Sequence, residues 1–99
     1  MMADLSIEAK AMMLGVFLSP KTKLTMHNVE SVLSPKAAKG MSDLQEAGLV
    51  TATPDRGAVI YQLTEAGMAL DRRSIVKGDP FKWMKEHASF PIAVKKVRS

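Results

Sequence analysis

The sequence predicts one small α+β domain built from short helices and a single β-hairpin. Three observations indicate this class. Apolar residues recur at helical spacing through the first half of the chain, strand-like alternation surrounds a turn signal at residues 54–57, and helical spacing returns after it. A chain of 99 residues, of which 46% are hydrophobic, supports one modest core, so we expect a single compact unit.

The first helix is expected over residues 5–17. Its apolar residues follow the rhythm of an amphipathic helix, Asp4 or Ser6 can cap it, and Pro20 limits its end.

The apolar run inside this helix is too short to span a bilayer, and acidic residues precede it where a secretory signal would carry positive charge. The chain also has no cysteine, which excludes a disulfide framework and fits a reducing compartment. We therefore expect a cytoplasmic protein without a membrane segment.

Two further helices are expected in quick succession. After a brief strand contact by Leu24, Thr25 is a plausible cap for a short second helix over residues 25–33. Ser34 then caps a third helix, because its oxygen can satisfy an orphan amide while Pro35 occupies the first helical position. So short a link forces the two helices to cross steeply, which is the geometry of a helix-turn-helix.

The third helix has one apolar and one polar stripe, and Gly48 suits the left-handed residue that ends it. The apolar stripe includes Ala37, Met41 and Leu44. The polar stripe begins with a basic turn and consists of Lys36, Lys39, Ser42, Asp43 and Glu46.

A tight hairpin follows, with strands over residues 49–53 and 58–63 and with Arg56 near its tip. Thr64 can cap a fourth helix over residues 64–76, Gly78 offers a stop, and the last eleven residues look extended. We therefore divide the chain into a domain at residues 1–77 and an aromatic, basic extension at residues 78–99.

Three helices, a projecting hairpin and a following helix make a winged helix-turn-helix. The phrases DLQEAGLV and YQLTEAG resemble the segments that join recognition helix, wing and next helix in the MarR and PadR types of winged-helix transcription regulators. The similarity covers about residues 5–72. It implies that the third helix enters the major groove of double-stranded DNA while the wing tip touches the flanking groove or backbone.

Carried over by position, the resemblance nominates residues that contact DNA. Lys36, Lys39 and Ser42 lie on the third helix, and Arg56 lies at the wing tip. Backbone contacts are expected from two lysines before the second helix and from a basic C-terminal arm: Lys21, Lys23, Lys95, Lys96 and Arg98.

Several nominations have a plain structural alternative. Lys36 and Lys39 can form an ordinary solvated helix face, with Lys39 pairing to Asp43 at i+4. Arg56 can simply keep the tip soluble, and the C-terminal cations can serve solubility. Asp43 and Glu46 would repel phosphate, and the third helix carries neither Arg nor Asn for bidentate base contacts.

Charge is unevenly distributed along the chain. The net charge is +4, yet residues 1–76 hold eight Lys and Arg against eight Asp and Glu, and residues 77–99 hold six against two. Non-specific DNA affinity comes largely from neutralised phosphates, so only a local basic face is expected.

The aromatic segment of the extension must cover apolar surface. Its four large side chains bury a homodimer interface or pack back on the first or fourth helix: Phe81, Trp83, Met84 and Phe90. The first alternative is our prediction.

Catalytic and metal sites are not expected. His27 and His87 have no second ligand at suitable spacing, so we expect no metal and no cofactor. Neither a nucleophile motif nor a phosphate-cradling glycine loop is present, so we expect no enzyme.

Two functional hypotheses follow. The first is a small winged-helix DNA-binding protein, a transcriptional regulator acting as a homodimer. The second keeps the fold but uses it as a protein-interaction module, such as an adaptor or an inhibitor encoded by a phage or mobile element. Its motivation is the neutral charge of residues 1–76 and the acidic half of the third helix's polar stripe.

Overall fold

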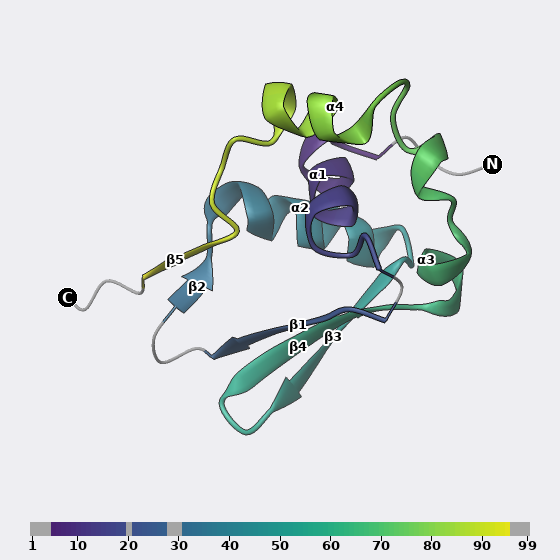
Figure 1. Cartoon of the computed structure of the whole chain (residues 1–99). Coiled ribbons are helices and arrows are strands. Elements are labelled where there is room, and N and C mark those ends of the chain that lie inside the picture. Colours follow the sequence, from purple (N-terminus) through teal and green to yellow (C-terminus); the bar gives the residue numbers. More distant parts are fainter. Residues whose placement is uncertain (1–4, 20, 28–30, 96–99) are drawn as a thin grey trace.

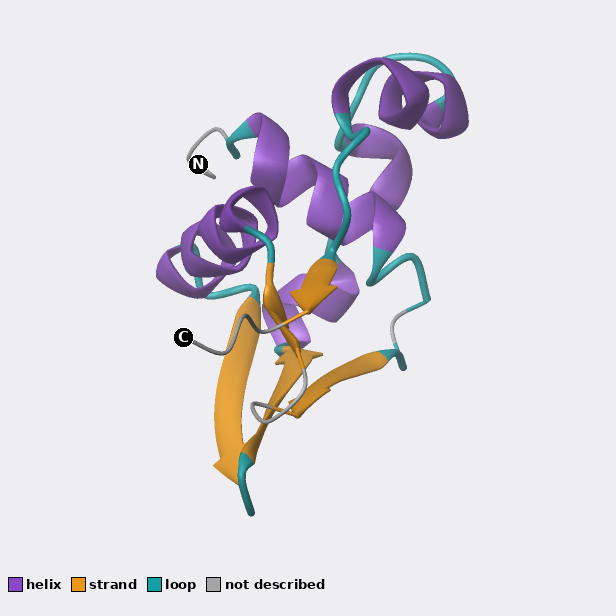
Figure 2. Ribbon diagram, turned by 90° about the vertical axis from the view of Figure 1, so that its left-hand side faces the viewer, coloured by secondary structure: helices purple, strands orange, loops and turns teal. Residues whose placement is uncertain are grey.

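The computed structural model describes residues 5–19, 21–27 and 31–95. The fold is α+β, with helices gathered over one side of a small antiparallel sheet (Figure 1; Figure 2). None of the described helices is long and apolar enough to cross a membrane. The elements run in the order α1 (Ile7–Gly15), β1 (Lys23–His27), β2 (Ser31–Leu33), α2 (Pro35–Glu46), β3 (Val50–Asp55), β4 (Ala58–Leu63), α3 (Glu65–Ala69), the 3-10 helix η1 (Arg72–Ser74), α4 (Pro80–His87) and β5 (Ala93–Lys95).

The strands form two antiparallel groups. The larger sheet has the order β1-β4-β3, so the hairpin strand β4 is its centre. The smaller is a ribbon of β2 and β5, in which Val32 lies opposite Val94. The amide of Ser34 donates to the carbonyl oxygen of Ile92 at 3.0 Å, which ties the C-terminal segment to the start of α2.

The two long helices begin at the predicted capping residues. The Ser6 hydroxyl oxygen accepts from the amide of Ala9 at 3.1 Å, and the Ser34 hydroxyl oxygen accepts from the amide of Ala37 at 3.2 Å. At Gly40 a Cβ atom would lie 2.5 Å from the Glu8 carbonyl oxygen. The absence of a side chain there lets α1 and α2 pack with their backbones close together.

The core lies between these helices and the sheet. Its largest fully buried side chains are Phe17, Met12, Met13, Met41 and Leu44. Burial of Met41 confirms its predicted place on the apolar stripe, and all three methionines suit this core because the flexible thioether fills irregular gaps.

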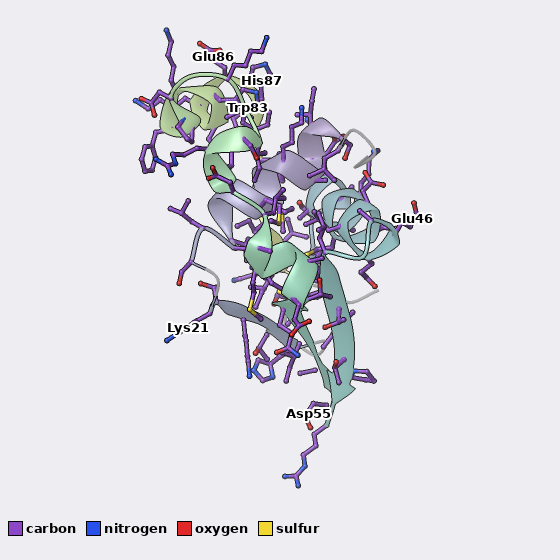
Figure 3. All side chains as sticks on the ribbon, turned by 90° about the vertical axis from the view of Figure 1, so that its right-hand side faces the viewer. Lys21, Glu46, Asp55, Trp83, Glu86 and His87 are labelled. Carbon is purple, nitrogen blue, oxygen red and sulfur yellow. The ribbon has the colours of Figure 1, made fainter. Side chains whose placement is uncertain are left out.

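The hairpin is confirmed and its turn is tight. Arg56 has φ of 48° and Gly57 has φ of 82°, so both central residues of the two-residue turn are left-handed. That geometry matches the twist of the flanking strands. All of β3 beyond Val50 is exposed, and Asp55 lies at the far end of the ribbon (Figure 3).

The second helix, predicted over residues 25–33, is wrong for the described part of that range. Residues 23–27 form β1, which pairs with β4, and residues 31–33 form β2, which pairs with β5. The segment KLTMH alternates, with Leu24 and Met26 turned inward and its other side chains exposed. This period of two fits a strand, and pairing with distant strands overrides the weak helical pattern. The first of the two helices in the predicted helix-turn-helix is therefore not formed by the described residues. The predicted strand contact by Leu24 is confirmed.

The fourth helix is much shorter than predicted. Thr64 does cap it, but α3 ends at Ala69, and Leu70 adopts an extended conformation. The Asp71 carboxylate then accepts from the amide of Arg73 at 3.0 Å, which caps the short 3-10 helix η1 instead of continuing α3. A separate helix, α4, begins at Asp79, whose carboxylate accepts from the amide of Phe81 at 3.0 Å.

Candidate nucleic-acid interface

The hairpin tip presents a cation at the end of a projecting ribbon. Arg56 is exposed and forms no ion pair with the described residues. His27, at the end of β1, lies opposite Ala58, and Ala58 directly follows the turn. His27 is exposed as well, so an imidazole lies beside the tip. Asp55 pairs with the same Ala58 and adds one carboxylate to this end of the sheet.

Helix α2 presents Lys36 in its first turn. The side chain is exposed and no ion pair with the described residues holds it. The N-terminus of a helix carries a partial positive charge, which adds to that of the lysine. Ser42 is exposed two turns later, and Glu46 is exposed at the end of the helix (Figure 3). The cationic part of α2 is thus its start.

Lys39 is bound to neighbouring carboxylates. Its Nζ donates to Oδ2 of Asp43 at 2.9 Å and lies 3.9 Å from Oε1 of Glu8 on α1. The hydrogen bond from Lys39 to Asp43 is the main cause that raises the pKa of the lysine above its usual 10.5. The alternative that Lys39 pairs with Asp43 is confirmed, and this pairing offsets much of the positive charge that Lys39 would offer to phosphate.

Asp43 also belongs to the seam between α1 and α2. The Ser6 hydroxyl donates to its Oδ2 at 2.5 Å, and this bond, followed by the one from Lys39, holds the pKa of the carboxyl below its usual 3.8. Because both donors satisfy the carboxylate, Asp43 repels an approaching phosphate less than the sequence suggested.

Lys21 and Lys23 lie at the other end of β1. Lys23 is opposite Gln62, four residues along the strand from His27, which is roughly 13 Å at about 3.3 Å per residue. Figure 3 shows Lys21 far from Asp55. Both lysines lie beside Met68 of α3, so the structure does not bring them together with Arg56.

Lys95 lies at the end of the β2–β5 ribbon that is away from α2. It is exposed on β5 opposite Ser31, four residues before Pro35, which is roughly 13 Å at about 3.3 Å per residue. The structure therefore does not bring Lys95 directly beside Lys36. Lys96 and Arg98, predicted in the same basic arm, lie outside the described residues.

Most of the predicted dimer surface packs on the chain's own core. Trp83, Met84 and Phe90 are half-buried against it, as the packing alternative proposed, and the Trp83 ring stacks on His87 with centroids 4.8 Å apart. Only Phe81 is widely accessible, at 69% exposure. A homodimer through this segment stays a prediction, with Phe81 as the single anchor still available to it.

Sequence reasoning missed the position of His27 beside the hairpin tip. The signal was the alternation in KLTMH, which places residue 27 on the solvent side of a strand. Both histidines are exposed, and the described residues contain no group of three His, Cys, Asp or Glu that could hold a metal ion.

Comparison of the chain with protein-family models, with curated proteins and with solved structures gives no match. The two motifs that carry the resemblance have a structural role in this chain, because they meet at one joint. The Thr64 hydroxyl donates to the Gly48 carbonyl oxygen at 2.6 Å, and the Thr64 amide donates to the Leu49 carbonyl oxygen at 3.0 Å. A Cβ atom at Gly67 would collide with that second oxygen. The joint fixes where α2 ends relative to the hairpin and α3.

Proposed function

We propose that this protein binds double-stranded DNA through the β3–β4 hairpin and the start of α2, as a small transcriptional regulator. The observation that carries the proposal is the exposed Arg56 at the tip of a ribbon that extends away from the core (Figure 1). A cation on a narrow projection suits a DNA groove, where the negative potential is focused.

The remaining contacts are expected to go to phosphates. Lys36 lies at the start of α2 and Lys95 lies at the far end of the β2–β5 ribbon, and neither is held by an ion pair with the described residues. Lys39 contributes less, since Asp43 and Glu8 already neutralise it. Few phosphates are therefore neutralised, so the affinity is expected to be modest and to fall with a shallow slope as salt rises.

Sequence readout is expected to be weak. Helix α2 has no Arg for a bidentate guanine contact and no Asn for adenine, so Lys36 is its main base-reading candidate. The exposed Glu46 at its far end disfavours burial of the whole helix against phosphate. We therefore propose that α2 enters the groove by its first turns only.

Charge reversal tests the proposal. Fluorescence anisotropy with a labelled mixed-sequence duplex is measured for the unchanged protein, Arg56→Glu and Lys36→Glu. Lys82→Glu is the matched control. Lys82 is exposed on α4, at the opposite end of the molecule from the hairpin tip, and the change in net charge is the same as in the two interface variants. Each interface variant should lose about tenfold or more in affinity. Equal losses in all three variants would show a general charge effect and remove the proposed site.

A further inference from the structure

An open apolar groove lies between the end of α1 and α4. Its volume is about 610 Å³, and it is far from the hairpin tip (Figure 1). Leu18 is 49% exposed and Phe81 is 69% exposed, so two large apolar side chains lie in solvent at the same site. The side chains used in the argument below are Leu14, Leu18, Phe81, Met84 and Lys85.

The packing of α4 explains why the groove stays open. No residue of α4 is fully buried, and its contact with α1 is made where the Met84 methyl group lies over Gly15. A Cβ atom at Gly15 would be 3.0 Å from that methyl group. Phe81 and Lys85 precede and follow Met84 on the same stripe of the helix, and Leu18 lies past the end of α1. Because α4 is short, the described residues leave Leu18 and Phe81, on the two sides of the groove, uncovered.

Charge around the groove favours an acidic occupant. Lys85 is the one charged residue in its lining. A second copy of this chain that met the groove with the same face would bring its own Lys85 against this cation together with its Phe81. Like charges repel, whereas carboxylates beside an apolar anchor complement the site.

We propose that the α1–α4 groove is a docking site for a short, acidic amphipathic helix of another protein. A bulky apolar side chain of that helix inserts between Leu18 and Phe81, above Leu14 and Met84, and a neighbouring carboxylate pairs with Lys85. Amphipathic helices commonly bind apolar grooves in this way. Figure 3 shows Trp83, Glu86 and His87 of α4 at the opposite end of the molecule from Asp55, so the groove stays accessible when the hairpin holds DNA.

Two synthetic peptides test the proposal. Both carry leucines at positions i, i+3, i+4 and i+7, and the remaining positions are glutamate in one peptide and lysine in the other. Each is labelled with fluorescein and titrated with the full chain at physiological salt. The acidic peptide should bind about tenfold or more tightly than the basic one. Equal binding of the two, or no binding of the acidic peptide, would overturn the proposal.

Variants assign the binding to the groove. Leu18→Glu and Phe81→Glu should each weaken binding of the acidic peptide about tenfold, and Lys85→Glu should reverse the preference between the peptides. Met68→Glu is the matched control, since Met68 is 50% exposed on α3 and lies outside the groove. These positions are exposed, so circular dichroism should show an intact fold. An effect of Met68→Glu as large as that of Phe81→Glu would contradict the assignment.

Two other occupants give different results. If a second copy fills the groove, sedimentation of the free protein shows a dimer that Phe81→Glu dissociates. If a membrane surface fills the groove, the protein binds vesicles of phosphatidylcholine and phosphatidylglycerol more strongly than it binds the acidic peptide. Either result overturns the proposal. Duplex binding should be unchanged by Leu18→Glu, so the outcome for DNA and the outcome for the groove are independent.

Discussion

The hydroxyl group of Ser6 donates to the carboxylate of Asp43 at 2.5 Å and joins the N-cap of α1 to the third turn of α2. The same hydroxyl oxygen caps α1 through the amide of Ala9. Lys39 completes the arrangement from the same side of α2 as Asp43. The polar seam between the two helices is thus built from one hydroxyl group, one carboxylate and one ammonium group.

The stability contributed by Asp43 should disappear in acid. Its folded-state pKa lies below the usual 3.8, chiefly through the Ser6 hydrogen bond and then through Lys39. A lowered pKa stabilises the fold fully above the unfolded value, and this stabilisation is lost as pH falls through the folded value. Asp43→Asn should therefore lower Tm at neutral pH, and the difference from the unchanged protein should shrink as pH falls below the usual carboxyl pKa of 3.8. Thermal melts followed by circular dichroism measure this difference.

The control for that experiment is Asp55→Asn. Asp55 is exposed at the hairpin end and forms no ion pair with the described residues, so its replacement should alter Tm little at any pH. A difference for Asp43→Asn that stays constant from neutral pH into acid would exclude the carboxylate charge as its cause.

Gly40→Ala should destabilise the fold strongly. The new methyl group would lie 2.5 Å from the oxygen and 2.8 Å from the carbon of the Glu8 carbonyl group. These are backbone atoms of α1, so they cannot move aside as the end of a flexible side chain can. Overpacking of this kind costs about 1–3 kcal/mol. Gly15→Ala is a matched change, since its methyl group meets only the end of the flexible Met84 side chain. Urea unfolding should show the larger loss for Gly40→Ala, and equal losses would contradict the close approach of the helices.

Ser34→Ala should weaken the start of α2. Ser34 is 3% exposed, and its hydroxyl oxygen accepts from the Ala37 amide, which would be left without this partner. Loss of such a cap costs about 0.5–2 kcal/mol. Ser42→Ala removes an exposed hydroxyl group from the same helix and should be nearly neutral in the same denaturation assay. If both variants are neutral, the cap does not stabilise this helix.

Arg56→Asn separates the charge of the hairpin tip from its conformation. Asparagine tolerates a positive φ better than arginine, so the turn with φ of 48° at this position should be at least as stable. The variant should keep or raise Tm while its duplex affinity falls. The slope of log affinity against log salt should decrease by about one. Unaltered affinity together with an unaltered slope would place DNA binding elsewhere or nowhere on this protein.

Much of the local structure could be read from the sequence because its causes are local. The caps at Ser6, Ser34 and Thr64 and the left-handed Gly48, with φ of 76°, depend on residues within a few positions of each other. The turn around Arg56 is equally local. Local patterns of this kind placed the hairpin tip and the first turn of α2 along the chain, whereas their nomination as candidate DNA contacts came from the resemblance to winged-helix regulators.

Only the tertiary structure decided the segment around residues 23–33 and the arrangement of the charges. Strand β1 pairs with β4, and β2 pairs with β5, a strand about sixty positions away, so no local pattern could reveal either partner. The same folding moved Lys23 away from Arg56 and placed Glu8 and Ser6 beside the Lys39–Asp43 pair. A sequence specifies where a helix begins through contacts within one turn, whereas the partners of a strand or a surface charge depend on distant chain segments that meet only after folding.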